Sequence, residues 1–569
     1  MLRWTCHYSP CERLFVLIRY FEQLKKSALA QSLLITALCV VVYWIGPIST
    51  YETNDDVYLS LVFSGKLLVS TPDPHVVFVN FALAQVFARL YAAIPAIPWF
   101  GIFQIGSILL SVFFLNYCFS VTRIHDKFLM RMAISLASAV PFLFLIQYTK
   151  TAVALAVTGY LSLYLLHDSS FRSRMNTLFL HAIAVSFLLV SFSLRKESFF
   201  LATILCGFLV INALMKRRIT LIISLSAGVI LIVVFTLVHK QNYGAEWQDF
   251  YEVKKVTEDI IDYDKILYNS NEDLFSKAGL SKNDYDFLES WGYADGRIYS
   301  KERLTDISRK SNKQSGAIAF LPALMMGKSF PAKHYILTMA CLTLLTLLYY
   351  RQRYSFLFLC VLLPFIACAG ILAWQGRFPP RVSTAMVYFL PWAIIVLSGD
   401  LRQRLPSMPV AVVTLLLLAA SAHGQFQDLF SIAQYRLIQN QDLHRLGVLV
   451  SRRPITQVVL GSSYPFGGIL PFESTDYLSG TPIVWFSSGL NQSPLQKKQL
   501  AELHIDDIFS SLINGSETYM VIKPVLTSTL QRYIYEHYQK KIVAIPAYSG
   551  KSLTMYRLMT VNTSITIPD

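Results

Sequence analysis

The sequence has little charge for its length. Only 15% of its 569 residues are Asp, Glu, Lys or Arg, whereas soluble domains carry roughly 25%. Hydrophobic residues make up 54% of the chain, and the mean hydropathy is +0.46. The apolar residues come in blocks of about 20, the length that crosses the ~30 Å hydrocarbon core of a bilayer. Composition therefore excludes a string of soluble domains and predicts a polytopic membrane protein.

Several familiar catalytic motifs are also missing. The sequence has no HExxH, P-loop, GxGxxG or GxSxG, so it offers no support for zinc, nucleotide-binding or serine-hydrolase chemistry. Its eight cysteines include no CxxC pair, and none lies in the long hydrophilic regions, so no disulfide framework is expected. The net charge of +15 does not indicate nucleic-acid binding, because the cations sit in short loops where membrane orientation accounts for them.

The apolar blocks predict about 11 transmembrane helices. The first 26 residues carry five cations against two acids, which places the N-terminal segment 1–27 in the cytoplasm. The run 76–93 fits this topology only as an interfacial or re-entrant helix, because a crossing there would invert every later basic loop. The predicted spans are 28–48, 99–120, 130–147, 151–166, 177–194, 198–215, 219–238, 336–350, 355–373, 382–399 and 407–423.

The predicted fold is therefore mainly α, with outer interfacial helices beside the spans. A transmembrane domain covers 28–423 and includes a first outer loop, 49–98, and a large outer loop, 239–335. The large loop is rich in acids and aromatic rings, which suit either a folded loop or sugar binding. In 424–569, β-rich runs alternate with helical stretches, which predicts a small extracytoplasmic α/β domain. The runs are 458–461, 483–486, 519–522 and 542–545, and the helical stretches are about 493–512 and 525–540.

Paired acids follow the first predicted span, in the segment Asn54-Asp55-Asp56. They can serve as helix caps, because Thr53 or Asn54 suits the N-cap position and carboxylates in the first turn face the positive helix end. A carboxylate here can also act as a general base, or hold an acceptor hydroxyl or a metal. The two roles are compatible, so the sequence leaves both open.

A set of cations lies where membrane orientation does not need them, at the outer ends of predicted spans. Snorkelling to lipid headgroups or pairing with Glu197 would explain them. A shared phosphate pocket would also explain them, because Arg binds phosphate through its planar fork. Their position on the same face as the paired aspartates favours the phosphate pocket. The five residues are Lys150, Arg195, Lys196, Arg377 and Arg381.

Together these features resemble the GT-C superfamily, integral membrane glycosyltransferases that use polyprenyl-phosphate sugars. The segment Asn54–Gly65 looks like the family's first-loop acidic segment, and Thr71–Asn80 is similar to the proline-led helix that follows it there. The resemblance implies that Asp55 or Asp56 is the catalytic base or positions the acceptor, and that the outer cations bind the donor phosphate. Candidates for lining the acceptor pocket are Asn54, Tyr58, His75 and Trp374.

The resemblance implies an enzyme of envelope polysaccharide biosynthesis in the bacterial cytoplasmic membrane. It would move a hexose-class sugar from a polyprenyl-phosphate donor to a glycan or glycolipid on the outer face. No metal ligand is singled out, and a role for a divalent metal stays open. One alternative is an O-antigen polymerase or ligase, in which Arg377 and Arg381 would matter more than the aspartates. Another is a transporter of a lipid-linked substrate, although the sequence shows no internal repeat of the kind common in transporters.

Overall fold

The structure is a computed structural model. It describes residues 27–66, 69–122, 128–166, 174–215, 219–263, 266–310, 330–349, 354–374, 379–397, 408–452, 455, 457–461, 466–474, 477, 483–486, 488–515 and 517–561. The N-terminal segment predicted to be cytoplasmic lies almost wholly outside these ranges.

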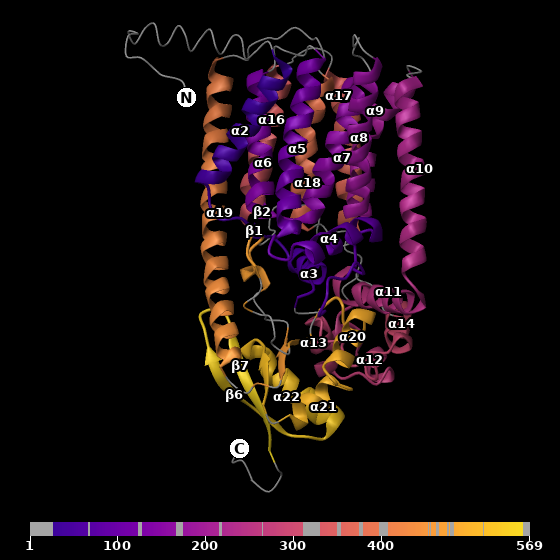
Figure 1. Ribbon diagram of the computed structural model, residues 1–569, viewed down its shortest axis with the longest axis vertical. Coiled ribbons are helices and arrows are strands. Elements are labelled where there is room, and N and C mark those ends of the chain that lie inside the picture. The colour runs from indigo at the N-terminus through magenta and orange to yellow at the C-terminus, as the bar shows by residue number, and fades with distance from the viewer. Residues whose placement is uncertain are drawn as a thin grey trace, which may run out of the picture.

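A bundle of long, roughly aligned helices forms one end of the molecule (Figure 1). Its helices are α2 (Ala28–Ile45), α5 (Trp99–Val121), α6 (Phe128–Phe144), α7 (Tyr148–Leu166), α8 (Arg174–Leu194), α9 (Lys196–Met215), α10 (Ile219–Asn242), α16 (Phe330–Tyr349), α17 (Tyr354–Trp374), α18 (Pro380–Leu397) and α19 (Met408–Ser451). Each range predicted to be a span coincides with one of these helices. The protein is therefore mainly helical, as the composition indicated.

Within the described residues, five helices are long and apolar enough to cross a membrane by length and composition alone. The number of crossings predicted from the sequence stays a prediction. The five segments are Ala28–Ile45, Trp99–Val121, Tyr148–Leu166, Met175–Leu194 and Ile219–Asn242.

Two short helices lie at the end of the bundle that faces the rest of the molecule (Figure 1). Helix α3 (Asn54–Ser64) follows strand β1 (Thr50–Tyr51) and ends at Gly65, whose φ of 67° is left-handed. Helix α4 (Phe81–Ala93) begins where the Asn80 side chain accepts the backbone N–H of Ala82. At 1.5 Å per residue, its 13 residues reach about 20 Å, which is too short to span a bilayer. The run 76–93 therefore does not form one membrane-crossing helix.

The other end of the molecule combines the large loop with the C-terminal region (Figure 1). The loop folds into α11 (Ala245–Glu258), the π-helical turn η2 (Asp259–Tyr263), η3 (Tyr268–Ser270), α12 (Glu272–Lys277), α13 (Lys282–Glu289) and α14 (Lys301–Lys310). The C-terminal region holds β3 (Gln457–Leu460), η5 (Phe466–Gly468), β4 (Ile483–Trp485), α20 (Pro494–Glu502), α21 (Ile508–Asn514), β5 (Thr518–Val521), α22 (Pro524–Tyr538), β6 (Ile542–Ser549) and β7 (Thr554–Thr560).

The strands form a five-stranded sheet in the order β4-β3-β5-β7-β6. Strands β3, β4 and β5 are parallel, whereas β7 runs antiparallel to β5 and β6. All four runs predicted to be strands are strands, but β7 was not predicted. The helical stretch predicted at about 493–512 is two helices, α20 and α21, and α19 passes without a break through residue 424.

One hydrophobic core joins the loop helices to the sheet. It contains buried side chains from the loop, such as Phe287 and Tyr299, together with Phe509, Met520 and Tyr533 from the C-terminal region. Within it, the Phe287 and Tyr533 ring centroids lie 4.8 Å apart. The two segments are separated in sequence by several bundle helices, yet they fold as one unit.

Candidate active site

Strand pairing fixes the position of the paired acids. Strand β1 pairs in parallel with β2 (Leu145–Ile146), directly before α7. This pairing brings the first turn of α3 against the start of α7. The carboxylate of Asp56 accepts the backbone N–H of Tyr148 at 2.8 Å, the amide of Gln104 at 3.2 Å and the hydroxyl of Thr53 at 2.9 Å. Both Asp56 oxygens are thus engaged, and the side chain is fully buried.

Asp55, one residue earlier, faces a cavity. Its side chain is 35% exposed, and its Oδ2 lies 3.9 Å from Nη2 of Arg381 in the first turn of α18. The cavity has a volume of about 520 Å³ and is lined by residues of the bundle end, the loop helices and the C-terminal region. We call it the acidic cavity because four carboxylates line it: Asp55, Glu197, Glu258 and Asp262.

Three cations also line the acidic cavity: Arg195, Arg381 and Lys254. Arg195, between α8 and α9, hydrogen-bonds the hydroxyl of Tyr148. The guanidinium of Arg195 and the ammonium of Lys254 each lie 5.0 Å from the centre of the Phe78 ring. Phe78 has a φ of 80°, a strained value for a residue with a side chain. The strained backbone therefore belongs to the residue whose ring contacts two of the three cations.

Aromatic rings close the acidic cavity on the side of the C-terminal region. Trp485 stacks on Tyr58, with ring centroids 4.6 Å apart, and also packs on Phe466. Trp291 enters from the loop, with its backbone carbonyl held by the side-chain amide of Asn491 at 2.7 Å. The cavity thus combines carboxylates, cations and aromatic faces, a set that suits polar, charged and sugar-like ligands together.

The structure brings only some of the predicted site residues to this cavity. Asn54, Asp55, Tyr58, Arg195 and Arg381 line it. Arg377 lies outside the described residues, and only the backbone of Trp374 falls within them.

Other predicted residues have different surroundings. Lys150 is buried, pairs with Glu52 at 2.8 Å and donates to the carbonyls of Pro141 and Leu145 at the end of α6. Lys196 is exposed beside Glu197. His75 pairs with Asp73 at 2.8 Å and packs on Trp247. None of these three lines the acidic cavity.

Sequence reasoning missed several lining residues. Lys254, Glu258 and Asp262 recur every four residues along α11 and η2, so they share one helical face. This spacing could have indicated a charged face, but nothing in the sequence places that face opposite Asp55. Trp291 and Trp485 come from distant segments, and only the tertiary fold brings them to one cavity.

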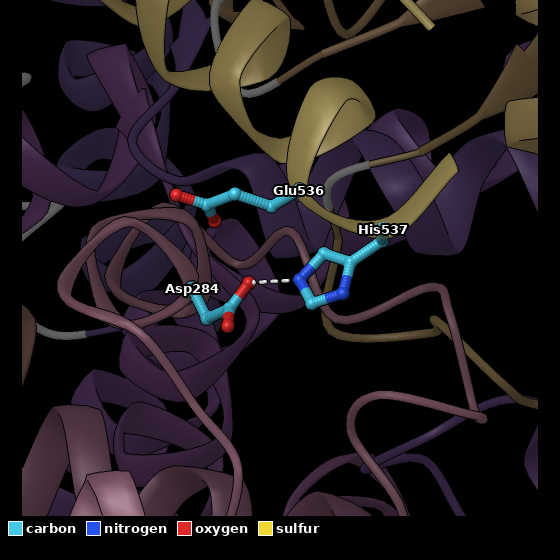
Figure 2. Close-up of side chains that lie close together, drawn as sticks. All are labelled: Asp284, Glu536 and His537. Atoms are coloured by element: carbon cyan, nitrogen blue, oxygen red, sulfur yellow. Dashed lines mark hydrogen bonds and ion pairs between the residues drawn. The ribbon is translucent and has the colours of Figure 1, made fainter. Parts of the chain in front are cut away.

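Figure 2 shows a separate group of possible metal ligands, none of which lines this cavity. Asp284, Glu536 and His537 gather on α13 and α22, and Nε2 of His537 lies 2.7 Å from Oδ1 of Asp284. The other Asp284 oxygen accepts the backbone N–H of Ser281 in a capping box, and Glu536 accepts the Ser281 hydroxyl. Protein contacts account for this arrangement. Within the described residues, the carboxylates of the acidic cavity form no comparable group of three.

No protein-family model and no curated protein matches the chain. Similar solved structures include two of ArnT from Cupriavidus metallidurans, one bound to undecaprenyl phosphate and one in the apo state. The first match covers 94% of this chain and 99% of ArnT at 12% identity, with a TM-score of 0.39. The second covers 92% and 97% at 12% identity, with a TM-score of 0.37.

The likeness runs along most of the chain. Its identity and TM-score are too low to assign an activity, a donor or an acceptor, so the proposed function rests on this chain's own residues.

Proposed function

We propose that this chain is a membrane glycosyltransferase that moves a sugar from a polyprenyl-phosphate carrier to a hydroxyl of an envelope glycan or glycolipid. The observation that carries the proposal is the juxtaposition of the Asp55 carboxylate with Arg381 and Arg195 in one cavity. The reaction needs a base on one side of the sugar and positive charge on the other. This cavity offers both.

In the proposed reaction, the acceptor oxygen attacks the anomeric carbon of the donor sugar, and the bond from that carbon to the phosphate oxygen breaks. The Asp55 carboxylate takes the acceptor hydroxyl proton. Polyprenyl phosphate leaves with the bonding electron pair, and guanidinium groups stabilise the charge that develops on it. Attack opposite the leaving group inverts the anomeric centre.

Asp55 is favoured over Asp56 as the base because it alone of the pair lines the cavity. Asp56 has both oxygens occupied by Thr53, Gln104 and the backbone of Tyr148. We therefore assign it a positioning role, holding the first turn of α3 against α5 and α7. The end of the bundle beside the cavity suits a lipid-linked donor, because a polyprenyl tail can stay among apolar helices.

The test is complementation of a deletion strain, with mass spectrometry of its envelope glycans. Wild type should restore one sugar per glycan unit, whereas Asp55→Asn should not. With purified protein, the variant should lower the transfer rate by about a hundredfold or more, the usual range for loss of a general base. The matched control is Asp249→Asn, which changes a 76% exposed carboxylate on α11 outside the cavity.

Full activity of well-expressed Asp55→Asn would overturn the proposal. Loss of glycan chain length in the deletion strain, restored by Asp55→Asn, would indicate an O-antigen polymerase or ligase instead.

A further inference from the structure

A second cavity adjoins the acidic cavity. Its volume is about 430 Å³, and the two cavities share Asn54 and Phe466 in their linings. It lies between α19, η5, the start of α22 and the loop that joins β6 to β7. We call it the basic cavity because three cations line it and no carboxylate does: Arg436, Lys523 and Lys551.

The buried carboxylate of Asp442 lies behind the wall of the basic cavity, beside Gly550 and Ser552, but does not pair with the three cations. Within the described residues, none of its three cations has a carboxylate within ion-pair distance. The Nη1 of Arg436 donates to the Gln439 side chain at 2.9 Å, whereas its Nε is buried without a partner. Because Gln439 is a neutral partner, the positive charge of this guanidinium remains available to an anion in the cavity.

Two local features hold the cations in place. A Cβ added at Gly467 would lie 1.5 Å from Nη1 of Arg436, so a larger residue there would push the guanidinium out of this position. The buried Asp442 accepts the backbone N–H and hydroxyl of Ser552 at 2.6 and 2.8 Å. These bonds tie the loop that carries Lys551 to α19.

The basic cavity also lies where backbone geometry favours anions. Lys523 follows the carboxyl end of β5, and Phe466 follows that of β3, its parallel neighbour. Ligands commonly bind at this edge of parallel strands. Helix α22 begins there, with Lys523 at its N-cap and no side-chain cap bond, so its positive end faces the cavity.

We propose that the basic cavity binds an anionic group, phosphate or carboxylate, on the glycan acceptor, a claim that rests on the proposed function. An acceptor anchored there would pass Asn54, which lines both cavities, and present its hydroxyl to Asp55. The acceptor is then an acidic glycan rather than a neutral one. Arg436 lies 28 residues along α19 from Met408, which is about 42 Å at 1.5 Å per residue. That exceeds the ~30 Å hydrocarbon core, so a glycan in water reaches this cavity more readily than a membrane lipid does.

The test measures binding without donor, using the full-length protein in lipid nanodiscs. The probes are fluorescent hexasaccharides of equal length: neutral maltohexaose, its terminal phosphate ester, and hexagalacturonate. Wild type should bind at least one anionic probe about tenfold or more tighter than the neutral one, since charge-assisted contacts are the strong ones. Added salt should reduce this preference.

The double variant Arg436→Gln/Lys551→Gln should lose the preference for anions, whereas Arg436→Lys should retain part of it. The matched control Lys277→Gln/Lys540→Gln removes two exposed lysines elsewhere and should bind like wild type. Equal binding of neutral and anionic probes by wild type would overturn the proposal. So would an unchanged preference in the double variant.

The two proposals can fail separately. Asp55→Asn should abolish transfer but keep the anion preference. Anion binding without any donor-dependent transfer would reject the proposed function and leave the basic cavity as an anion site. Donor-dependent transfer without a preference for anionic probes would reject the anion site and leave the proposed function standing.

Discussion

Asp55 and Asp56 are adjacent in sequence but have opposite surroundings. Asp55 is partly exposed and faces Arg381 across the acidic cavity. Asp56 is fully buried among donors, and its burial raises its pKa to about 7. The raised pKa means that the folded protein holds the Asp56 proton more tightly than the unfolded chain does. One acid is therefore open to a ligand, and the other is bound to the backbone.

The raised pKa of Asp56 gives a testable pH dependence. The pKa of such a carboxyl is higher in the folded state than its unfolded value of about 3.9. The carboxyl then stabilises the fold fully at a pH below the unfolded pKa. This contribution is lost as the pH rises through about 7. Asp56→Asn should remove this fall in stability between about pH 4 and 7. The stability of the variant relative to wild type should therefore increase as the pH rises. Thermal unfolding in detergent across this range measures the difference.

The matched variant Asp56→Ala should be less stable than Asp56→Asn by about 1–3 kcal/mol at every pH, because neither variant titrates and only Ala leaves the Tyr148 N–H buried without an acceptor. An Asn variant with the same pH slope as wild type would show that Asp56 is not the responsible group.

At the scale of elements, Lys150 holds the start of α7, whereas the sequence suggested that this lysine binds the donor phosphate. Lys150 pairs with Glu52 beside β1 and donates to the carbonyls that end α6. A lysine can satisfy the free carbonyls at the end of a helix in this way. Its contacts join α6, α7 and the segment before α3, which together place the paired acids.

Lys150→Met should therefore reduce stability rather than donor binding. Removing one member of a buried ion pair costs about 3 kcal/mol. The loss should appear as a lower midpoint of denaturation, while KM for the donor stays the same. Lys196→Met, at a 68% exposed side chain, is the control and should change stability little. A raised donor KM with unchanged stability would return Lys150 to the phosphate site.

At the scale of the whole molecule, the large loop and the C-terminal region share one core. Asp284 of α13 and His537 of α22 form one of the polar ties between them (Figure 2). Asp284 raises the pKa of His537 by hydrogen bonding to its charged form. Movement of one region relative to the other would have to break this tie.

The stability of that contact should fall as the pH rises. A histidine whose folded-state pKa is raised contributes fully below its unfolded value of about 6.5, and the contribution is lost as the pH rises through the folded-state pKa. Hydrogen exchange of α13 and α22, corrected for intrinsic rates, should therefore be faster at pH 8 than at pH 6. His537→Gln should remove the difference. The control His504→Asn, at an exposed position, should keep it.

Much of the fold was accessible from the sequence because its signals are local. An apolar block near 20 residues long specifies a helix by itself, since lipid leaves backbone groups no other partners. Every predicted span coincides with a helix for that reason. The four predicted strands were found from their β-rich runs. Strand β7 (Thr554–Thr560) was missed because its residues TMYRLMT alternate only weakly.

The candidate site was only partly accessible. Asp55, Arg195 and Arg381 stood out because polar groups beside apolar runs are conspicuous. Lys254, Trp291 and the basic-cavity residue Arg436 did not, because each belongs to a hydrophilic segment where such residues are ordinary. Their importance comes from long-range packing, which no local pattern records.

The sequence by itself determined the class of protein, the helices and the acidic segment that opens the site, because hydrophobic length and composition act locally. Only the tertiary structure decided which aspartate faces a cavity. It also placed Lys150 in a buried ion pair with Glu52, and the loop and the C-terminal region around one acidic cavity. Those outcomes depend on contacts between residues far apart in the chain, such as β1 with β2 and Phe287 with Tyr533. Such contacts form only when the whole chain packs.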